Sequence, residues 1–236
     1  MTGGAIPPAP AYVDGRFSNG SVWVEYLAER LDLVGKLENY SFGGACSGRE
    51  SYVSFAYGIP GLPGLQDELD LFAAARGGRA DPRALYIVQA GANDIFLWAE
   101  SGMNTSLADF AALTASNIAD AVARLRQMGA RNILVVDVAD IGLTPYGLAS
   151  GFDTMLTGVT MTVNNAVAAK LRKTKHREGP ELGYSACSAR FARSWWNPRC
   201  LVLLMLRTLT WRSKFAIPTR FCFGMEFIPQ PWDTRC

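Results

Sequence analysis

Two short, continuous apolar runs stand out along the chain, at residues 84–89 and 132–138. Glycine or proline lies close to both ends of each run, which is typical of a strand that other elements cover on both faces. A weaker segment at 38–42 ends at Gly43-Gly44 and predicts a further short strand.

Around these runs, apolar residues recur with the spacing of an α-helix. The clearest stripe covers 107–128 and stops at Gly129, and weaker stripes cover 22–30, with Ser21 as the expected N-cap, and 160–171. Strands that alternate with helices through short connections predict a parallel sheet covered by helices on both faces. In such sheets, ligands bind outside the carboxyl ends of the strands.

Two glycine-containing segments follow predicted strands and are the candidates for chemistry. Gly43-Gly44-Ala45 comes after the strand at 38–42, and Gly91-Ala-Asn-Asp94 comes after the run at 84–89. The Asn93 amide and the backbone N–H of Gly44 are donors of the kind that stabilise a developing oxyanion. Taken singly, each segment is more typical of a turn, because Gly, Asn and Asp all favour turns.

Four blocks taken in order are far more specific than either segment alone. They are a Pro-rich loop and helix at 7–27, Asn-Tyr-Ser-Phe-Gly-Gly-Ala at 39–45, Gly-Ala-Asn-Asp at 91–94 and Asp-Ile-Gly-Leu-Thr-Pro at 140–145. This set spans nearly all of residues 3–171 and resembles the GDSL branch of the SGNH hydrolases, in particular its lipase, phospholipase and hemolysin-like members.

The resemblance implies a three-layer α/β/α, flavodoxin-like fold with a parallel sheet, in which the first strand lies between the second and third. It implies hydrolysis of a small-molecule or lipid carboxylic ester by a Ser–His–Asp arrangement, in a monomer without a metal or organic cofactor. Gly44 and Asn93 match the oxyanion-hole residues. Family members are often secreted. This sequence shows neither a signal peptide nor an apolar run long enough to cross a membrane, so no compartment is predicted.

Two blocks of the family pattern are absent from the 236 residues: Gly-Asp-Ser-Leu, which carries the nucleophile on the first strand, and Asp-x-x-His, which carries the base. The lone histidine, His176, lies in a charge run and is interpreted as solvated. Ser18 and Ser47 are interpreted as loop serines, and Asp137 and Asp140 as turn residues. We expect an incomplete fold in which the missing first strand leaves its neighbours without ladder partners, and a poorly folded, inactive product.

The charge balance changes sharply near residue 171. Residues 1–170 hold 11 Lys/Arg against 17 Asp/Glu, a balance of −6, whereas residues 171–236 hold 12 against 4, a balance of +8. Four of the five cysteines also lie in the second segment, and their spacing matches no zinc or Cys-x-x-Cys pattern. Such a break indicates a domain boundary, a binding tail or a change of reading frame.

The genetic code favours the change of reading frame. Reading the codons of 221–236 from the third base of each allows Phe-Trp-Asp-Gly-Ile-His-Pro-Thr, which is the missing closing block of the family. We therefore interpret 1–174 as a partial SGNH/GDSL hydrolase domain and 175–236 as an aberrant basic, Cys/Trp-rich tail. Two alternatives remain: a tail that binds a membrane or nucleic acid, and a non-catalytic module that binds an ester or glycan. Since the frame slip is favoured, no nucleic-acid partner is expected.

Overall fold

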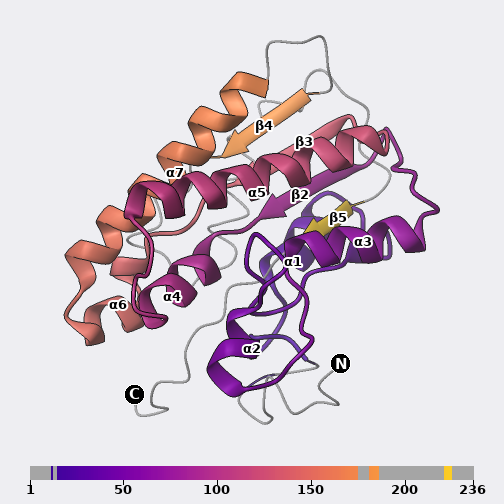
Figure 1. Ribbon diagram of the computed structural model, residues 1–236. Coiled ribbons are helices and arrows are strands. Elements are labelled where there is room, and N and C mark those ends of the chain that lie inside the picture. The colour runs from indigo at the N-terminus through magenta and orange to yellow at the C-terminus, as the bar shows by residue number, and fades with distance from the viewer. Residues whose placement is uncertain (1–11, 13–14, 175–180, 186–220, 225–236) are drawn as a thin grey trace.

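A five-stranded parallel sheet lies at the centre of the computed structural model, with the strand order β1-β5-β2-β3-β4 (Figure 1). The structure describes residues 12 and 15–174, together with the segments 181–185 and 221–224. The strands are β1 (Leu37–Asn39), β2 (Leu85–Gln89), β3 (Asn132–Val136), β4 (Glu181–Ser185) and β5 (Phe221–Gly224).

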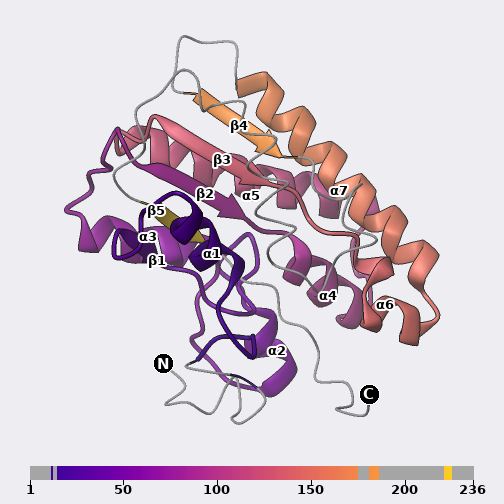
Figure 2. The ribbon, with the colours of Figure 1, turned by 180° about the vertical axis from the view of Figure 1, so that it is seen from behind.

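Helices cover both faces of this sheet, as the sequence predicted. They are α1 (Trp23–Arg30), α2 (Tyr52–Tyr57), α3 (Leu65–Ala75), α4 (Ala92–Glu100), α5 (Leu107–Gln127), α6 (Pro145–Ser150) and α7 (Asp153–Thr174), with a 3₁₀ turn, η1, at Ile141–Leu143. Figure 1 shows α5 and α7 in front of the sheet, and Figure 2 shows α1 on the opposite face. The fold is therefore the three-layer α/β/α arrangement that the sequence predicted.

Alternation along the strands divides the core into two clusters. Tyr86 and Val88 of β2 pack in the larger cluster with α3, α5 and α7, whereas Leu85 and Ile87 pack with α1 on the other face. Successive side chains of a strand point to opposite faces, so a continuous apolar run is what a strand buried on both sides requires.

Most predicted elements appear close to their expected bounds. The runs at 84–89 and 132–138 form β2 and β3, and the stripe at 107–128 forms α5. The stripe at 160–171 forms the C-terminal part of the longer helix α7. The strand expected at 38–42 is shorter and shifted to β1, because the chain turns where the N–H of Ser41 donates to Asn39 Oδ1 at 2.9 Å.

The prediction of Ser21 as the N-cap of α1 is wrong. Val22 occupies that position, and its N–H donates to Glu25 Oε2 at 2.7 Å while the N–H of Glu25 donates to Val22 O at 3.0 Å. The Glu25 carboxylate thus reaches back to the start of the helix, where negative charge is favourable. The bidentate contact of Glu25 with Arg16 holds this carboxylate in place.

The expectation that two strands lack ladder partners is also wrong. β5 fills the place between β1 and β2: Phe221 is the register partner of both Leu37 and Leu85, and Phe223 is the partner of Asn39 and Ile87. β4 pairs with the outer side of β3. Two strands from beyond residue 174 therefore belong to the sheet, although a domain boundary at that residue stays a prediction.

No helix among the described residues is long and apolar enough to cross a membrane. Within the same part of the chain, no group of three or more His, Cys, Asp or Glu side chains is arranged to hold a metal ion. His176 and three of the tail cysteines, Cys187, Cys200 and Cys236, lie outside the described residues.

Candidate oxyanion-binding site

Gly44 lies in the loop between β1 and α2, in a conformation that requires glycine. Its φ is +90°, and a Cβ atom built on it would lie 2.8 Å from the Cβ of Val53 and 3.0 Å from the Val53 nitrogen. The Gly44 carbonyl accepts a hydrogen bond from the N–H of Tyr52 at 2.7 Å. The helix α2 therefore packs directly on the Gly44 backbone, which leaves no room for a side chain.

Gly91 is the N-cap of helix α4, just after β2, so residues 91–94 enter a helix and do not form the simple turn that the segment taken singly would favour. Its φ is +116°, and a Cβ atom there would lie 2.6 Å from Val138 Cγ2. The chain enters the helix at Ala92, and Asn93 and Asp94 occupy its first turn. Both side chains are buried and reach the loop that carries Gly44.

Asn93 is bonded to the residue that follows Gly44. Its side chain is 0% exposed, and Nδ2 donates to the Ala45 carbonyl at 3.0 Å. Asn93 Oδ1 is buried without a hydrogen-bond partner in the described part of the chain. An amide nitrogen carries two hydrogens, so the bond to Ala45 leaves a second N–H for another acceptor. The structure thus brings together the two residues that the sequence singled out.

Asp94 holds the next part of the loop. Its Oδ2 accepts the N–H of Ser47 at 2.8 Å and its Oδ1 accepts the Ser47 hydroxyl at 2.5 Å, while Asn117 Nδ2 donates to Ser47 Oγ at 3.1 Å. Burial raises the pKa of Asp94 to about 6, against the opposing effect of the bonds from Ser47. Ser47 is itself fully buried and hydrogen-bonded, as expected for a structural loop serine.

Glu68 of α3 holds the other side of the loop, and the sequence analysis missed it. Its side chain is 2% exposed, and Oε1 accepts the N–H of Phe42 at 2.7 Å. Burial raises the pKa of Glu68 to about 8, and the bond from Phe42 opposes this rise. The available signal was helical spacing, because Glu68 falls on the same face as Leu65 and Phe72, which are buried.

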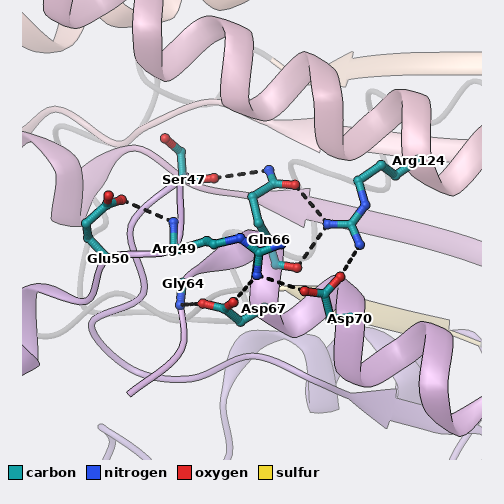
Figure 3. Close-up of polar contacts among 8 residues, drawn as sticks. All are labelled: Ser47, Arg49, Glu50, Gly64, Gln66, Asp67, Asp70 and Arg124. Atoms are coloured by element: carbon teal, nitrogen blue, oxygen red, sulfur yellow. Dashed lines mark hydrogen bonds and ion pairs between the residues drawn. The ribbon is translucent and has the colours of Figure 1, made fainter. Parts of the chain in front are cut away.

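Charged and amide side chains connect this loop to the outer surface of α3 and α5 (Figure 3). Gln66 Nε2 donates to the Ser47 carbonyl at 3.3 Å, and Arg124 Nη1 donates to both oxygens of Gln66 at 3.0 Å. Arg124 also pairs with Asp70, which pairs with Arg49. These outer ion pairs are largely exposed, so each contributes little to stability.

The remaining sequence candidates have structural contacts. Asp140 Oδ1 accepts the N–H of Gly142 at 3.0 Å and the hydroxyl of Thr157 at 2.8 Å, which confirms its role in a turn. Ser18 Oγ accepts the N–H of Gly20 at 3.2 Å. Asp137 is buried just after β3.

A wide, open surface cavity of about 890 Å³ lies between α2 and α3, and Gly44 and Asn93 are not among the residues that line it. Its apolar lining comes from Phe55, Leu62, Pro63, Leu71 and Leu97, and Ser51 and Ser54 contribute hydroxyl groups. Charged side chains, including Arg49 and Asp70, stand at the same cavity. Its volume is in the range of small-molecule sites.

A family profile described as GDSL-like Lipase/Acylhydrolase matches residues 2–186, which is well over half of the chain. The chain belongs to this family. The match runs from before the Pro-rich loop through β4, so it includes every block that carries the resemblance noted in the sequence.

Curated relatives of this GDSL-family chain are longer proteins. The phosphatidylcholine-sterol acyltransferase of Aeromonas hydrophila is 30% identical over 142 residues, which are 60% of this chain and 40% of the relative. The secreted effector protein SseJ of Salmonella typhimurium is 24% identical over 172 residues, which are 73% of this chain and 38% of the relative. The thermolabile hemolysin of Vibrio parahaemolyticus is 28% identical over 143 residues, 59% of this chain and 30% of the relative. The chain therefore spans at most 40% of the length of these relatives.

Proposed function

We propose that residues 1–174 carry the oxyanion-binding half of a carboxylic ester hydrolase or acyltransferase. In this proposal the backbone N–H of Gly44 and the second N–H of Asn93 Nδ2 bind the oxygen of the tetrahedral intermediate. The observation that carries it is the 3.0 Å hydrogen bond from Asn93 to the Ala45 carbonyl, which holds the amide against the residue next to Gly44. Family membership supplies the reaction class.

These two donors act when a nucleophile attacks the ester carbonyl and negative charge develops on its oxygen. Loss of one such donor lowers kcat by roughly 10²–10³-fold in hydrolases. The nucleophile and its base belong to the Gly-Asp-Ser-Leu and Asp-x-x-His blocks, and neither occurs in the 236 residues. We therefore propose that the chain does not turn over esters by itself, and that 175–236 derive from a displaced reading frame.

Lipid esters are the proposed substrate class for the complete enzyme. The relative from Aeromonas hydrophila is an acyltransferase named for phosphatidylcholine and sterol, and the relative from Vibrio parahaemolyticus is a hemolysin. The apolar lining of the cavity between α2 and α3 suits an acyl chain.

Hydrolysis of p-nitrophenyl butyrate tests the proposal in two forms of the protein. The 236-residue chain is expected to show no turnover above the buffer rate. A form with both missing blocks restored is expected to be active and to lose roughly 10²–10³-fold in kcat on Asn93→Ala. The exposed Asn104→Ala serves as the control. Turnover by the 236-residue chain that Asn93→Ala abolishes would contradict the claim of inactivity, and an unchanged kcat in the restored form would contradict the role of Asn93.

Sequencing of the gene and its transcript tests the displaced frame separately. The proposal expects a single-base change near codons 173–179 to restore Asp-Gly-Ile-His-Pro-Thr. A confirmed reading frame without such a change would refute it.

The cavity favours one second candidate, a non-catalytic module that binds an ester. Saturable binding of a non-hydrolysable ether lipid to the 236-residue chain, weakened by Leu97→Glu, is its expected signature. The exposed Leu113→Glu is the matched control, since α5 carries it away from this cavity. Binding that both variants leave unchanged would exclude the module.

A further inference from the structure

Two buried carboxyl groups hold the loop on opposite sides of Gly44. Glu68, from α3, accepts the N–H of Phe42 at 2.7 Å, and Asp94, from α4, accepts the N–H of Ser47 at 2.8 Å. Their side chains are 2% and 8% exposed. Two acids from different helices thus fix the backbone two residues before Gly44 and three residues after it.

The hydrogen bond from Asn93 to the Ala45 carbonyl lies between these two points. This stretch has one isolated bridge, between Ala45 and Ser51, and no strand ladder among the described residues. Backbone bonds such as those from the N–H of Ala45 to Phe42 O at 3.1 Å and from the N–H of Cys46 to Glu50 O at 2.9 Å hold it from within. The two acids attach it to α3 and α4. A backbone N–H forms a stronger hydrogen bond with an ionised carboxylate than with a neutral acceptor. Each acid, when ionised, therefore strengthens one attachment of the loop that carries Gly44.

We propose that Glu68 and Asp94 are positioning residues, which together hold the loop 42–47 so that the Gly44 N–H is fixed beside Asn93. This rests on the proposed function where it gives the Gly44 N–H a catalytic use. The two-point attachment of the loop is a separate property that can be measured without any turnover.

The two attachment points titrate in different pH ranges, which provides a signature for each. Burial raises the pKa of Glu68 to about 8 and that of Asp94 to about 6. The charged or titratable neighbours that face these groups are Asp67 for Glu68, and Glu50 and the buried Cys46 for Asp94. Ionisation of each acid strengthens the bond from its own amide, so the proton of that amide moves downfield as pH rises.

NMR of the ¹⁵N-labelled 236-residue chain between pH 4.5 and 9 is the test. The Ser47 amide proton is expected to shift with a midpoint near 6, and the Phe42 amide proton with a midpoint near 8. Glu68→Gln should abolish the Phe42 transition and keep that of Ser47, and Asp94→Asn should do the reverse. Asp137→Asn, which changes a buried acid outside this loop, should keep both.

Amide exchange of Ala45, Cys46 and Ser47 at pH 7 completes the test. Relative to the slowest-exchanging amides of β2 and β3, exchange is expected to accelerate more than tenfold in Glu68→Ala and in Asp94→Ala. Acceleration no greater than in Asp137→Ala, or no transition of either amide in the unmodified chain, would overturn the proposal. If an alanine variant does not fold, the titration of the Phe42 and Ser47 amide protons in the unmodified chain decides for or against the proposal. A normal titration beside an inactive restored enzyme would reject the proposed function and leave the attachment intact.

Discussion

Replacing Gly44 with alanine combines two separate penalties at one atom. The residue has φ +90°, a region that side chains rarely adopt, and the new Cβ would lie 2.8 Å from the Cβ of Val53 and 3.0 Å from its backbone nitrogen. Val53 is fully buried in the first turn of α2. Its Cβ and its backbone nitrogen are therefore fixed by the helix and cannot move aside as the end of a flexible side chain could.

The size of the effect follows from these two parts. Strained φ values in non-glycine residues cost about 1–3 kcal/mol, and overpacking of a tight core costs about 1–3 kcal/mol more. Gly44→Ala is therefore expected to lower the free energy of unfolding by roughly 2–6 kcal/mol. Since domains are stable by only about 5–15 kcal/mol, this is a large fraction of the total.

Urea unfolding followed by circular dichroism measures this loss. Gly58→Ala is the matched control, because Gly58 has φ +64° and no atom within 4 Å of its hypothetical Cβ, so it carries the conformational part alone. In a Val53→Ala background the penalty of Gly44→Ala should fall only in part, because the contact with Val53 Cγ2 is removed while those with its Cβ and backbone nitrogen remain. The reasoning is refuted if Gly44→Ala costs no more than Gly58→Ala.

Three further predictions concern other buried or capping groups. Burial raises the pKa of Glu68 from 4.5 to about 8, so protonated Glu68 stabilises the folded state fully below pH 4.5, and this stabilisation is lost as pH rises through 8. The loss is at most about 1.4 kcal/mol per pH unit, and it should be absent from the urea unfolding curves of Glu68→Gln. Glu25→Ala removes the carboxylate that caps α1 and should cost about 1 kcal/mol in thermal unfolding, whereas the exposed Glu29→Ala should not. The Asn164 amide donates to the Val138 carbonyl at 2.8 Å and accepts the Val138 N–H at 2.9 Å, just after β3. Asn164→Ala should therefore lower the free energy of unfolding in urea by about 2–3 kcal/mol, and the exposed Asn165→Ala should leave it close to unchanged. Equal losses in the two variants would refute the importance of these bonds.

The parts of the fold that were predictable from sequence depend on local pattern. β2, β3 and α5 have uninterrupted apolar runs or stripes, and their bounds were predicted to within two residues. The N-cap of α1 was predicted wrongly by one residue, because the Glu25 carboxylate caps the helix at Val22 in place of a side-chain cap at Ser21, and Arg16 holds that carboxylate. The place of β5 in the sheet was also not predictable, since it depends on register with residues that are distant in sequence.

In the candidate site, too, some residues could be predicted from the sequence and others could not. Gly44 and Asn93 could be identified because the four ordered blocks resemble a known family, and their place after strands of a parallel sheet predicts that they lie at one edge. Their Ala45 contact agrees with that expectation. The roles of Glu68 and Asp94 depend on burial, and burial of a carboxyl group is a property of the assembled helices rather than of any short segment.

The position of β5 has a consequence for the order in which the protein folds. Residues 221–224 leave the ribosome after the four other described strands, yet they join β1 to β2 inside the sheet. β2, β3 and the helices that cover them can associate during synthesis, whereas β1 can enter the sheet only once β5 is available. Contacts between such distant segments slow folding, and the unpaired edges of β1 and β2 are open to aggregation during the delay. The sheet is therefore completed late in folding, and the yield of folded protein depends on how fast β5 inserts.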